Sequence, residues 1–510
     1  MKYVLTNEEM RSADEYTIQT LGVPSATLME RAGEALADEA EKLAPTGNIL
    51  CVCGGGNNGG DGFVCARILK QRGREAEVLF LGEKMSEDCR LNAEKWQEVS
   101  GVTRTEFPEN KKIDVTVDCL FGTGFHGRLE GVYAQTVERL NEMKKSGVKI
   151  LSADIPSGLD GKSGLAEGVA VQADVTLCIG ELKTGVLLND GLDYAGQVLR
   201  KDIGIVLPKN TKNSYTFLSD LEYAAELLPA RRRNSHKGTY GRAAIVAGSF
   251  AYTGAAYLSA AACLRSGVGY TTLFTPEELL PYYVWKQPEI LIQPVCVGRE
   301  FVFEKEKFEG VLSYDSIAYG MGMGISKEVA KGAAYLLKSY MGKLILDADA
   351  LNSLAAYKKE EFERLFGEKK CELLLTPHVK EFSRLSGKNV AEILSDGVYA
   401  PIEFSETYSV NVLLKNAATV ITDGKRTAVN VSGNSGQAKG GSGDVLAGLI
   451  AGLCASGTSV FDGACLGAYI AGNAAEKATE KIGERSLTAT DVISYLGASF
   501  LNLEKQKTPR

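Results

Sequence analysis

The first half of the sequence contains three glycine-rich loops whose polar side chains could bind a ligand. The first loop spans residues 51–63 and reads CVCGGGNNGGDGF. Its amide and carboxylate oxygens suit a hard cation or ribose hydroxyls, although asparagines in such a loop also simply adopt turn conformations. Glycines let the backbone approach a phosphate at a helix N-terminus. The polar side chains of this loop are Asn57, Asn58 and Asp61.

The other two loops are DCLFGTGFHGRLEG at 118–131 and ADIPSGLDG at 153–161. Each follows a predicted strand, so the three loops should meet at the carboxyl edge of one parallel sheet, where open α/β sheets bind ligands. A single aspartate at a strand end is often only a helix cap. Three polar loops on one edge predict a binding site. These two loops add the oxygens of Asp118, Asp154 and Ser157 and the donors of His126 and Arg128.

The second half of the sequence has its own glycine-rich segment, GGSGD at 440–444, which opens a helix rich in alanine, leucine and glycine. Gly443 and the helix N-terminus could stabilise phosphate charge, and Asp444 is either a base or a cap. The segment does not fit the GxxxxGK[ST] pattern of a P-loop. GMGMG at 320–324 follows a predicted strand and is either a phosphate-facing turn or a plain strand–helix turn.

The elements that must position these loops alternate between strands and helices. Such alternation implies right-handed crossovers and a largely parallel sheet, so the fold class is α/β. In the first half, strands are predicted at 49–53, 77–81, 113–119, 148–153 and 175–179, with helices at 62–72, 87–100 and 131–146. In the second half, strands are predicted at 243–247, 269–274, 315–319, 343–347, 372–375, 410–414, 418–422 and 426–430, with helices at 254–267 and 326–340.

The pattern breaks between the two halves, which predicts two domains at 1–205 and 236–510 joined by a linker at 206–235. Prolines and the arginine run at 231–233 mark this segment, and we interpret the run as a solvated basic linker rather than an anion site.

Composition excludes several classes of protein. The net charge of −7 argues against a nucleic-acid-binding protein, which needs a basic face. The 11 cysteines are scattered in apolar runs without zinc spacing, so we expect reduced core residues. The start of the chain has no apolar signal core, and no stretch is a credible membrane span, so we expect a cytoplasmic protein.

Taken together, the motifs resemble a known pair of domains. GGGNNGGDG, DCLFGTG and DIPSGLDG resemble the NAD(P)H-hydrate epimerase domain, which has a Rossmann-like three-layer α/β/α fold. The second half is similar to the ADP-dependent NAD(P)H-hydrate dehydratase of the ribokinase-like fold. The segments that carry this second resemblance are HKGTYGRAAIVAGS (236–249), GAAYLSAAACLRSGVGY (254–270), LDADALN (346–352), LTPHVKEFSRL (375–385), LLKNAATVI (413–421) and GGSGDVLAGLIAG (440–452).

The resemblance implies a bifunctional repair enzyme for hydrated NADH and NADPH, whose first domain interconverts the R and S epimers. Asn58, Asp118 and Ser157 would hold potassium. Asp154, at a strand end, is the candidate acid–base group, and Lys183 is either its partner or a surface lysine. The residues implied to contact the hydrate are Asn57, Asn58, Gly59, Gly60, Asp61, Gly122, Thr123, Gly124, Phe125, His126, Gly127, Arg128, Tyr133 and Asp154.

In the second domain the resemblance implies that Asp444 takes the proton of the C6 hydroxyl of the S hydrate, whose oxygen then attacks the β-phosphorus of ADP. Loss of phosphate would leave NAD(P)H and AMP, with Mg²⁺ as the usual partner of the phosphates. Ala255, Gly322 and His378 would line the hydrate pocket. The residues implied to bracket the AMP part are Lys415, Asn416, Ala417, Ala418, Thr419 and Gly443.

Three other interpretations compete with this one. A ribokinase-like vitamin or sugar kinase fused to an epimerase-like domain shares the glycine–aspartate signature but would make a stable phosphorylated product. A non-enzymatic scaffold conflicts with the charge and with the intact polar loops. A Rossmann dehydrogenase needs an acid at the end of the next strand, whereas Glu77 opens that strand. We also expect a homo-oligomer.

Overall fold

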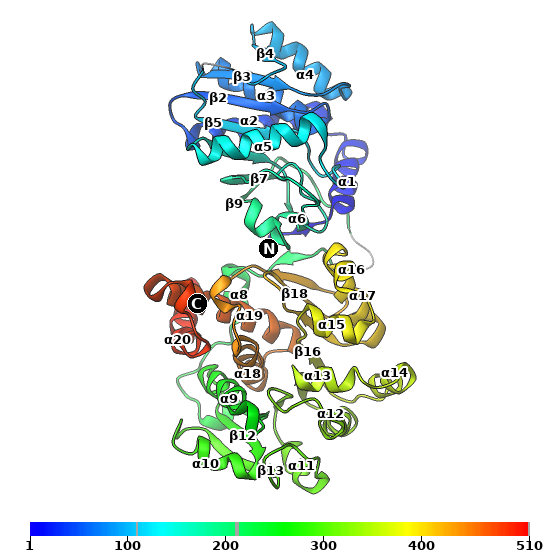
Figure 1. The fold of residues 1–510 in the computed structure, drawn as a ribbon, viewed down its shortest axis with the longest axis vertical. Helices are drawn as coiled ribbons and strands as arrows, with labels where there is room; N and C mark the ends of the chain where they lie inside the picture. Colours follow the sequence, from blue (N-terminus) through cyan, green and yellow to red (C-terminus); the bar gives the residue numbers. More distant parts are fainter. Residues whose placement is uncertain (109–110, 210–213, 508–510) are drawn as a thin grey trace. The chain divides into compact units, whose positions relative to one another are not determined.

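The computed structural model describes residues 1–108, 111–209 and 214–507, and these form two compact units that divide near residue 211. Figure 1 traces both units along the chain. Both are α/β, which confirms the predicted fold class.

The N-terminal unit is built on a seven-stranded sheet in the order β4-β3-β2-β5-β6-β7-β9, in which every neighbouring pair is parallel. A two-stranded parallel pair, β1 with β8, stands beside it. The strands are β1 (Val4–Leu5), β2 (Asn48–Cys53), β3 (Glu75–Phe80), β4 (Thr103–Arg104), β5 (Val115–Cys119), β6 (Lys149–Ala153), β7 (Val175–Ile179), β8 (Leu182–Lys183) and β9 (Gln197–Lys201). The helices are α1 (Asn7–Glu15), the π-helix η1 (Tyr16–Thr20), α2 (Ser25–Leu43), α3 (Asn57–Gln71), α4 (Glu87–Glu98), α5 (Gly131–Lys145), α6 (Thr184–Leu187) and α7 (Gly191–Tyr194).

Alternation along β2 divides its side chains between two cores. Cys51 and Cys53 pack with α2 and α3 on one face of the sheet, whereas Leu50 and Val52 pack with α5 on the other. Helices on both faces make the three layers that we predicted (Figure 1).

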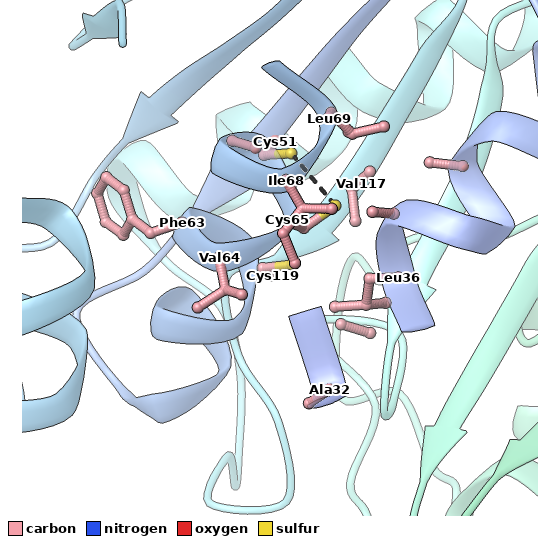
Figure 2. Close-up of a cluster of buried hydrophobic side chains, with 14 of the residues drawn as sticks. Ala32, Leu36, Cys51, Phe63, Val64, Cys65, Ile68, Leu69, Val117 and Cys119 are labelled. Atoms are coloured by element: carbon pink, nitrogen blue, oxygen red, sulfur yellow. Dashed lines mark hydrogen bonds between the residues drawn. The ribbon is translucent and has the colours of Figure 1, made fainter. Parts of the chain in front are cut away.

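Figure 2 shows the first of these cores, where side chains of α2 and α3 meet those of β2 and β5. The Sγ atoms of Cys51 and Cys65 lie 4.0 Å apart, and Cys119 lies in the same cluster. All 11 cysteines are buried and free, which confirms the prediction of core thiols.

The C-terminal unit is built on a ten-stranded sheet in the order β10-β19-β18-β17-β16-β15-β14-β11-β12-β13. Its pairs are parallel except β17–β18 and β18–β19. The strands are β10 (Phe217–Leu218), β11 (Arg242–Val246), β12 (Tyr270–Pro276), β13 (Leu291–Cys296), β14 (Ser316–Tyr319), β15 (Lys343–Leu346), β16 (Glu372–Leu375), β17 (Asn411–Leu414), β18 (Thr419–Thr422) and β19 (Thr427–Asn430).

Helices follow most of these strands and close the chain (Figure 1). The α-helices are α8 (Leu221–Leu227), α9 (Thr253–Arg265), α10 (Leu280–Tyr283), α11 (Lys305–Val311), α12 (Lys327–Ser339), α13 (Asp349–Leu354), α14 (Lys359–Gly367), α15 (Val379–Ser386), α16 (Val390–Ser395), α17 (Tyr399–Tyr408), α18 (Ser442–Ala455), α19 (Val460–Ile482) and α20 (Ala489–Gln506). Short 3₁₀ turns are η2 (Lys237–Tyr240), η3 (Phe250–Tyr252), η4 (Glu277–Leu279), η5 (Ser435–Gln437) and η6 (Glu484–Ser486).

The prediction that 206–235 is only a linker is wrong. Residues 217–218 form β10, which pairs with β19, and residues 221–227 form α8. Phe217 is 3% exposed, and Ala224 and Ala225 belong to the core of the C-terminal unit. A two-residue strand and a seven-residue helix are too short to show a hydrophobic period, so the sequence pattern missed them.

Helices α9 and α18 pack so closely that a glycine is required between them. A Cβ on Gly448 would lie 1.9 Å from the carbonyl oxygen of Ser259. Gly448→Ala should therefore destabilise the C-terminal unit by about 1–3 kcal/mol, because overpacking outweighs the gain of about 1 kcal/mol in helix propensity.

The matched control is Gly497→Ala in α20, where a Cβ meets nothing within 4 Å. This variant should be neutral or stabilising, and scanning calorimetry of the full chain compares the two. Equal effects of the two substitutions would contradict the close packing of α9 on α18.

Candidate active sites

A cavity of about 560 Å³ lies where the N-terminal strands end. Its lining contains members of all three predicted loops, together with Lys183. The predicted residues that line it are Asn57, Asn58, Asp61, Gly122, Thr123, Gly124, Phe125, Asp154 and Lys183. The structure therefore brings together most of the site that the first half of the sequence predicted.

Six predicted hydrate contacts lie outside this lining: Gly59, Gly60, His126, Gly127, Arg128 and Tyr133. His126 pairs instead with Asp160, Nδ1 to Oδ2 at 2.9 Å. Tyr133 donates its hydroxyl to the carbonyl of Leu81 at 2.9 Å and packs edge-on against Phe121. His126 and Tyr133 thus contact other parts of the protein, and a contact of any of the six with the hydrate stays a prediction.

The glycine-rich loop is partly helical, because α3 begins at Asn57 rather than at 62. Asn57 and Asn58 thus occupy the first turn of the helix. Asn57 Oδ1 accepts a hydrogen bond from Ser86 Oγ at 2.7 Å. A Cβ on Gly59 would lie 1.8 Å from the carbonyl oxygen of Gly54, which explains the glycine without a ligand. Gly59 and Gly60 are buried and do not line the cavity.

Oxygen atoms converge on the side chain of Asn58. Its Nδ2 donates to the carbonyls of Phe121 at 2.9 Å and Ala153 at 3.4 Å, and the Ser157 hydroxyl lies 3.4 Å from the same Phe121 carbonyl. Carbonyl and hydroxyl oxygens are ligands that a hard cation takes, but Asn58 turns its amide nitrogen rather than its oxygen towards these carbonyls. The assignment of Asn58, Asp118 and Ser157 to a potassium ion stays a prediction.

Asp118 is hydrogen-bonded to Ser157, one of the residues around Asn58. Its carboxylate is fully buried and accepts hydrogen bonds from Ser152 Oγ at 2.9 Å and from Ser157 N and Oγ at 2.9 and 2.6 Å. Burial raises the pKa of Asp118, while the Ser157 and Ser152 hydrogen bonds oppose that rise. The carboxylate fixes the hydroxyl of Ser157 at the site.

Asp154 and Lys183 form a buried ion pair at the cavity. Lys183 is 1% exposed and donates to Asp154 Oδ1 and to the carbonyl of Ile179. Asp154 Oδ1 also accepts from the backbone N–H of Ile179 at 3.1 Å. The interpretation of Lys183 as a surface lysine is therefore wrong, and it is the partner of Asp154.

In the C-terminal unit, Lys415, Asp347 and Asp444 gather at the carboxyl edge of the sheet. Lys415 follows β17, Asp347 follows β15, and Asp444 lies in the first turn of α18. Lys415 Nζ donates to Asp347 Oδ1 at 2.7 Å, and Asp347 is 1% exposed. The carboxylates of Asp347, Glu381 and Asp444 outweigh burial and raise the pKa of Lys415, so it stays cationic.

The environment of Asp444 suits a general base. Burial raises the pKa of Asp444 to about 6, the charge of Asp347 adds to the rise, and Lys415 opposes it. A carboxylate with a pKa near 6 is ionised at neutral pH but binds a proton more readily than an exposed aspartate.

Because the glycines of this site lack a Cβ, the other predicted residues can approach the backbone closely. A Cβ on Gly443 would lie 3.2 Å from Lys415 Nζ, and a Cβ on Gly322 would lie 2.7 Å from the Cβ of Ala255. Gly322 has φ +60°, which favours glycine. The backbone of GMGMG also packs on the strand end that carries Asp347, since a Cβ on Gly320 would meet the Asp347 carbonyl at 2.2 Å.

His378 is the N-cap of α15 and lies beside Lys415. Its Nδ1 accepts from the backbone N–H groups of Lys380 and Glu381 at 3.1 and 3.3 Å, and its backbone forms a bridge with that of Lys415. Burial, and then the charge of Lys415, lower the pKa of His378, so the ring is neutral at pH 7. The cap explains the position of this residue, and its contact with the hydrate stays a prediction.

Sequence reasoning missed Asp347 and Asp349 as functional residues, although LDADALN was noted as a motif. Asp349 Oδ2 accepts from the N–H of Gly324 at 2.8 Å and so holds the GMGMG loop. Ala348 between them has φ +49°, a left-handed conformation that is costly for a residue with a Cβ. In the sequence, the signal that could have found them is the pair of acids in LDADALN directly after a predicted strand.

Of the remaining predicted nucleotide contacts, Thr419 begins β18, and Asn416, Ala417 and Ala418 form the turn before it. Asn416 and Ala417 are exposed at its tip and Ala418 is buried. Across the described ranges, we find no helix that meets the length and hydropathy of a membrane span, and no cluster of three metal-ligating acid, histidine or cysteine side chains.

Comparisons with known proteins agree with this division of the chain. Residues 243–497 match the family described as NAD(P)H-hydrate dehydratase, and residues 25–185 match the family described as YjeF-related protein N-terminus. A ribokinase-like superfamily protein from Enterococcus faecalis is 22% identical, superposes with a TM-score of 0.50, and covers 59% of this chain and 100% of its own, which supports the fold of the second unit.

Relatives that carry both units span almost the whole chain. The bifunctional NAD(P)H-hydrate repair enzyme Nnr of Thermofilum pendens is 35% identical over 96% of this chain and 94% of its own. The Nnr proteins of Moorella thermoacetica and Escherichia coli are 33% and 31% identical, over 99% and 96% of this chain and 98% and 92% of their own. The chain therefore belongs to the family of bifunctional NAD(P)H-hydrate repair enzymes.

Proposed function

We propose that this chain restores hydrated NADH and NADPH in two steps. The N-terminal unit epimerises the R and S hydrates, and the C-terminal unit dehydrates the S form at the expense of ADP. The observation that carries the proposal is that each unit holds an aspartate beside a lysine where its parallel strands end: Asp154 with Lys183, and Asp444 with Lys415.

The dehydration follows from the groups around Asp444. Asp444 takes the proton of the C6 hydroxyl, the oxygen attacks the β-phosphorus of ADP, and AMP leaves. The phosphorylated hydrate then loses phosphate from C6 and a proton from C5, which forms the C5=C6 bond of NAD(P)H. Phosphate leaves far more readily than hydroxide, which is why a nucleotide is consumed.

Lys415 and the N-terminus of α18 would stabilise the charge that develops on the phosphates. Gly443 leaves room for this approach, because a Cβ there would lie 3.2 Å from Lys415 Nζ. Asp347 keeps Lys415 aimed at the site through the 2.7 Å ion pair. Mg²⁺, when bound, would neutralise phosphate charge, with Asp347 and Asp444 as the nearby carboxylates.

For epimerisation, Asp154 is the acid–base group. Lys183 compensates the negative charge of Asp154 and fixes the orientation of its carboxylate. Asn58 and Ser157, with the carbonyls of Phe121 and Ala153, would hold potassium, and Asp118 would orient Ser157. A bound cation supplies a fixed positive charge for polar groups of the hydrate.

The dehydratase half is tested with the S hydrate of NADH as sole substrate and either ADP or ATP. We expect NADH, AMP and inorganic phosphate in equal amounts with ADP, measured by absorbance at 340 nm and by chromatography. A vitamin or sugar kinase would leave the hydrate unchanged. Recovery of absorbance with ATP alone, giving ADP, would assign the step to the γ-phosphate instead.

A further inference from the structure

Helix α1 and the π-helix η1 turn one face towards the N-terminal cavity. Met10, Asp14 and Ile18 follow each other at intervals of four residues, and all three line the cavity. The π-helix that begins two residues after Asp14 is a rare geometry that occurs often at functional sites. Thr17 fixes it, since its hydroxyl donates to the carbonyl of Ala13 at 2.7 Å and accepts from the N–H of Val206 at 2.9 Å.

Asp14 has no structural task that explains its position. Within the described ranges its carboxylate makes no hydrogen bond or ion pair, and its neighbours on the helix face are Arg11 and the apolar Met10 and Ile18. An unpaired, half-buried carboxylate costs free energy. Residues kept at such a cost in a cavity are candidates for function.

The charges that face Asp14 come from four elements. Lys183 is the last residue of β8, Asp154 follows the end of β6, and Asp61 lies in α3. Arg11 lies on the same face of α1 as Asp14. Burial raises the pKa of Asp14 to about 6; Lys183 opposes the rise, and Asp154 and Glu15 add to it. Asp14 therefore binds a proton more readily than an exposed aspartate, and burial, followed by the charges of Asp154 and Asp14, raises the pKa of Asp61 well above its usual value.

Epimerisation at C6 requires proton transfer on two faces of the ring. When the C6–O bond breaks, the hydroxyl takes a proton and leaves as water, and the lone pair of the ring nitrogen forms a C=N bond. Water then adds to the opposite face and gives a proton to a base. Bonds, charge and protons balance, and no oxidant is used. One carboxylate cannot reach both faces of the planar intermediate.

Resting on the proposed function, we infer that Asp14 is the second acid–base group of the epimerisation, on one face of the hydrate, with Asp154 on the other. The two carboxylates come from different elements, α1 and the end of β6, and line the same cavity. In one direction Asp14 protonates the leaving hydroxyl and Asp154 accepts the proton of the entering water. In the reverse direction they exchange roles.

The test compares Asp14→Asn with Glu8→Gln in the full-length chain. Glu8 is an exposed acid in the first turn of the same helix, so its variant controls for loss of one charge. Starting from R-hydrate and ADP, we expect Asp14→Asn to lower the kcat of epimerisation by about 10²–10⁴-fold, with KM and S-hydrate dehydration unchanged. Glu8→Gln should stay near wild type, and Asp14→Glu should recover part of the rate.

The pH profile separates this role from a structural one. The kcat of wild-type epimerisation should change near pH 6, and this limb should be lost in Asp14→Asn. Epimerisation by Asp14→Asn within about threefold of wild type, or a uniform loss at every pH with an altered KM, would overturn the inference. If the wild-type chain itself fails to convert R-hydrate faster than the spontaneous rate, the proposed epimerase function fails instead.

Discussion

Asp444→Asn should lower the kcat of S-hydrate dehydration by about 10²–10⁴-fold, since an amide cannot accept the proton of the C6 hydroxyl. Asparagine has nearly the same shape, and the α18 turn that carries it is set by Gly441 with φ +98°, so the fold should persist. The measurement is the initial rate of absorbance gain at 340 nm with saturating ADP.

The pH dependence of the kcat of dehydration is a second test of the role of Asp444. The base works ionised, so the wild-type kcat should be constant above the Asp444 pKa of about 6 and fall as pH drops through it. This limb should vanish in Asp444→Asn. Glu328→Gln, in the first turn of α12, is the matched control and should leave both rate and profile unchanged. Asp444→Asn with a rate within tenfold of wild type would remove Asp444 from the mechanism.

Lys183→Met should abolish epimerisation and also destabilise the N-terminal unit by about 3–5 kcal/mol. Lys183 is 1% exposed and is the ion-pair partner of Asp154, so its loss leaves a carboxylate without compensation in the protein interior. Scanning calorimetry of the full chain and the conversion of R-hydrate measure the two effects.

The double variant Asp154→Asn/Lys183→Met separates stability from catalysis. With the unpaired charge gone, most of the stability should return, whereas epimerisation should stay lost. Lys149→Met is the control, because Lys149 pairs with Asp174 in an exposed setting where a bridge contributes at most about 1 kcal/mol. A double variant as unstable as Lys183→Met would show that the ion pair does not explain the effect.

The central strands were predictable because each is a short, buried and mostly apolar run. β5, β6 and β7 carry almost no exposed side chain, and their predicted limits are within two residues of the observed ones. The edge strands β9 and β13 were missed, since their side chains are largely exposed and show neither a continuous apolar run nor a clear alternation.

The candidate sites were predictable where a glycine loop follows a strand. Asp154, Lys183, Lys415 and Asp444 were all singled out, although the sequence could not show that Lys183 is buried. Asp14 was missed because it lies in a mainly polar helix, where one more acid carries no signal. Asp347 was missed because its partner, Lys415, is 68 positions away, and only the sheet brings them together.

The most direct test of the account is full recovery of NADH from a mixture of R and S hydrates by the single chain with ADP, followed quickly at 340 nm. Two working sites predict that absorbance returns completely, at a rate above spontaneous epimerisation of the R form. Recovery that stops at the S fraction would contradict the epimerase assignment. No recovery with ADP or ATP would contradict the account as a whole.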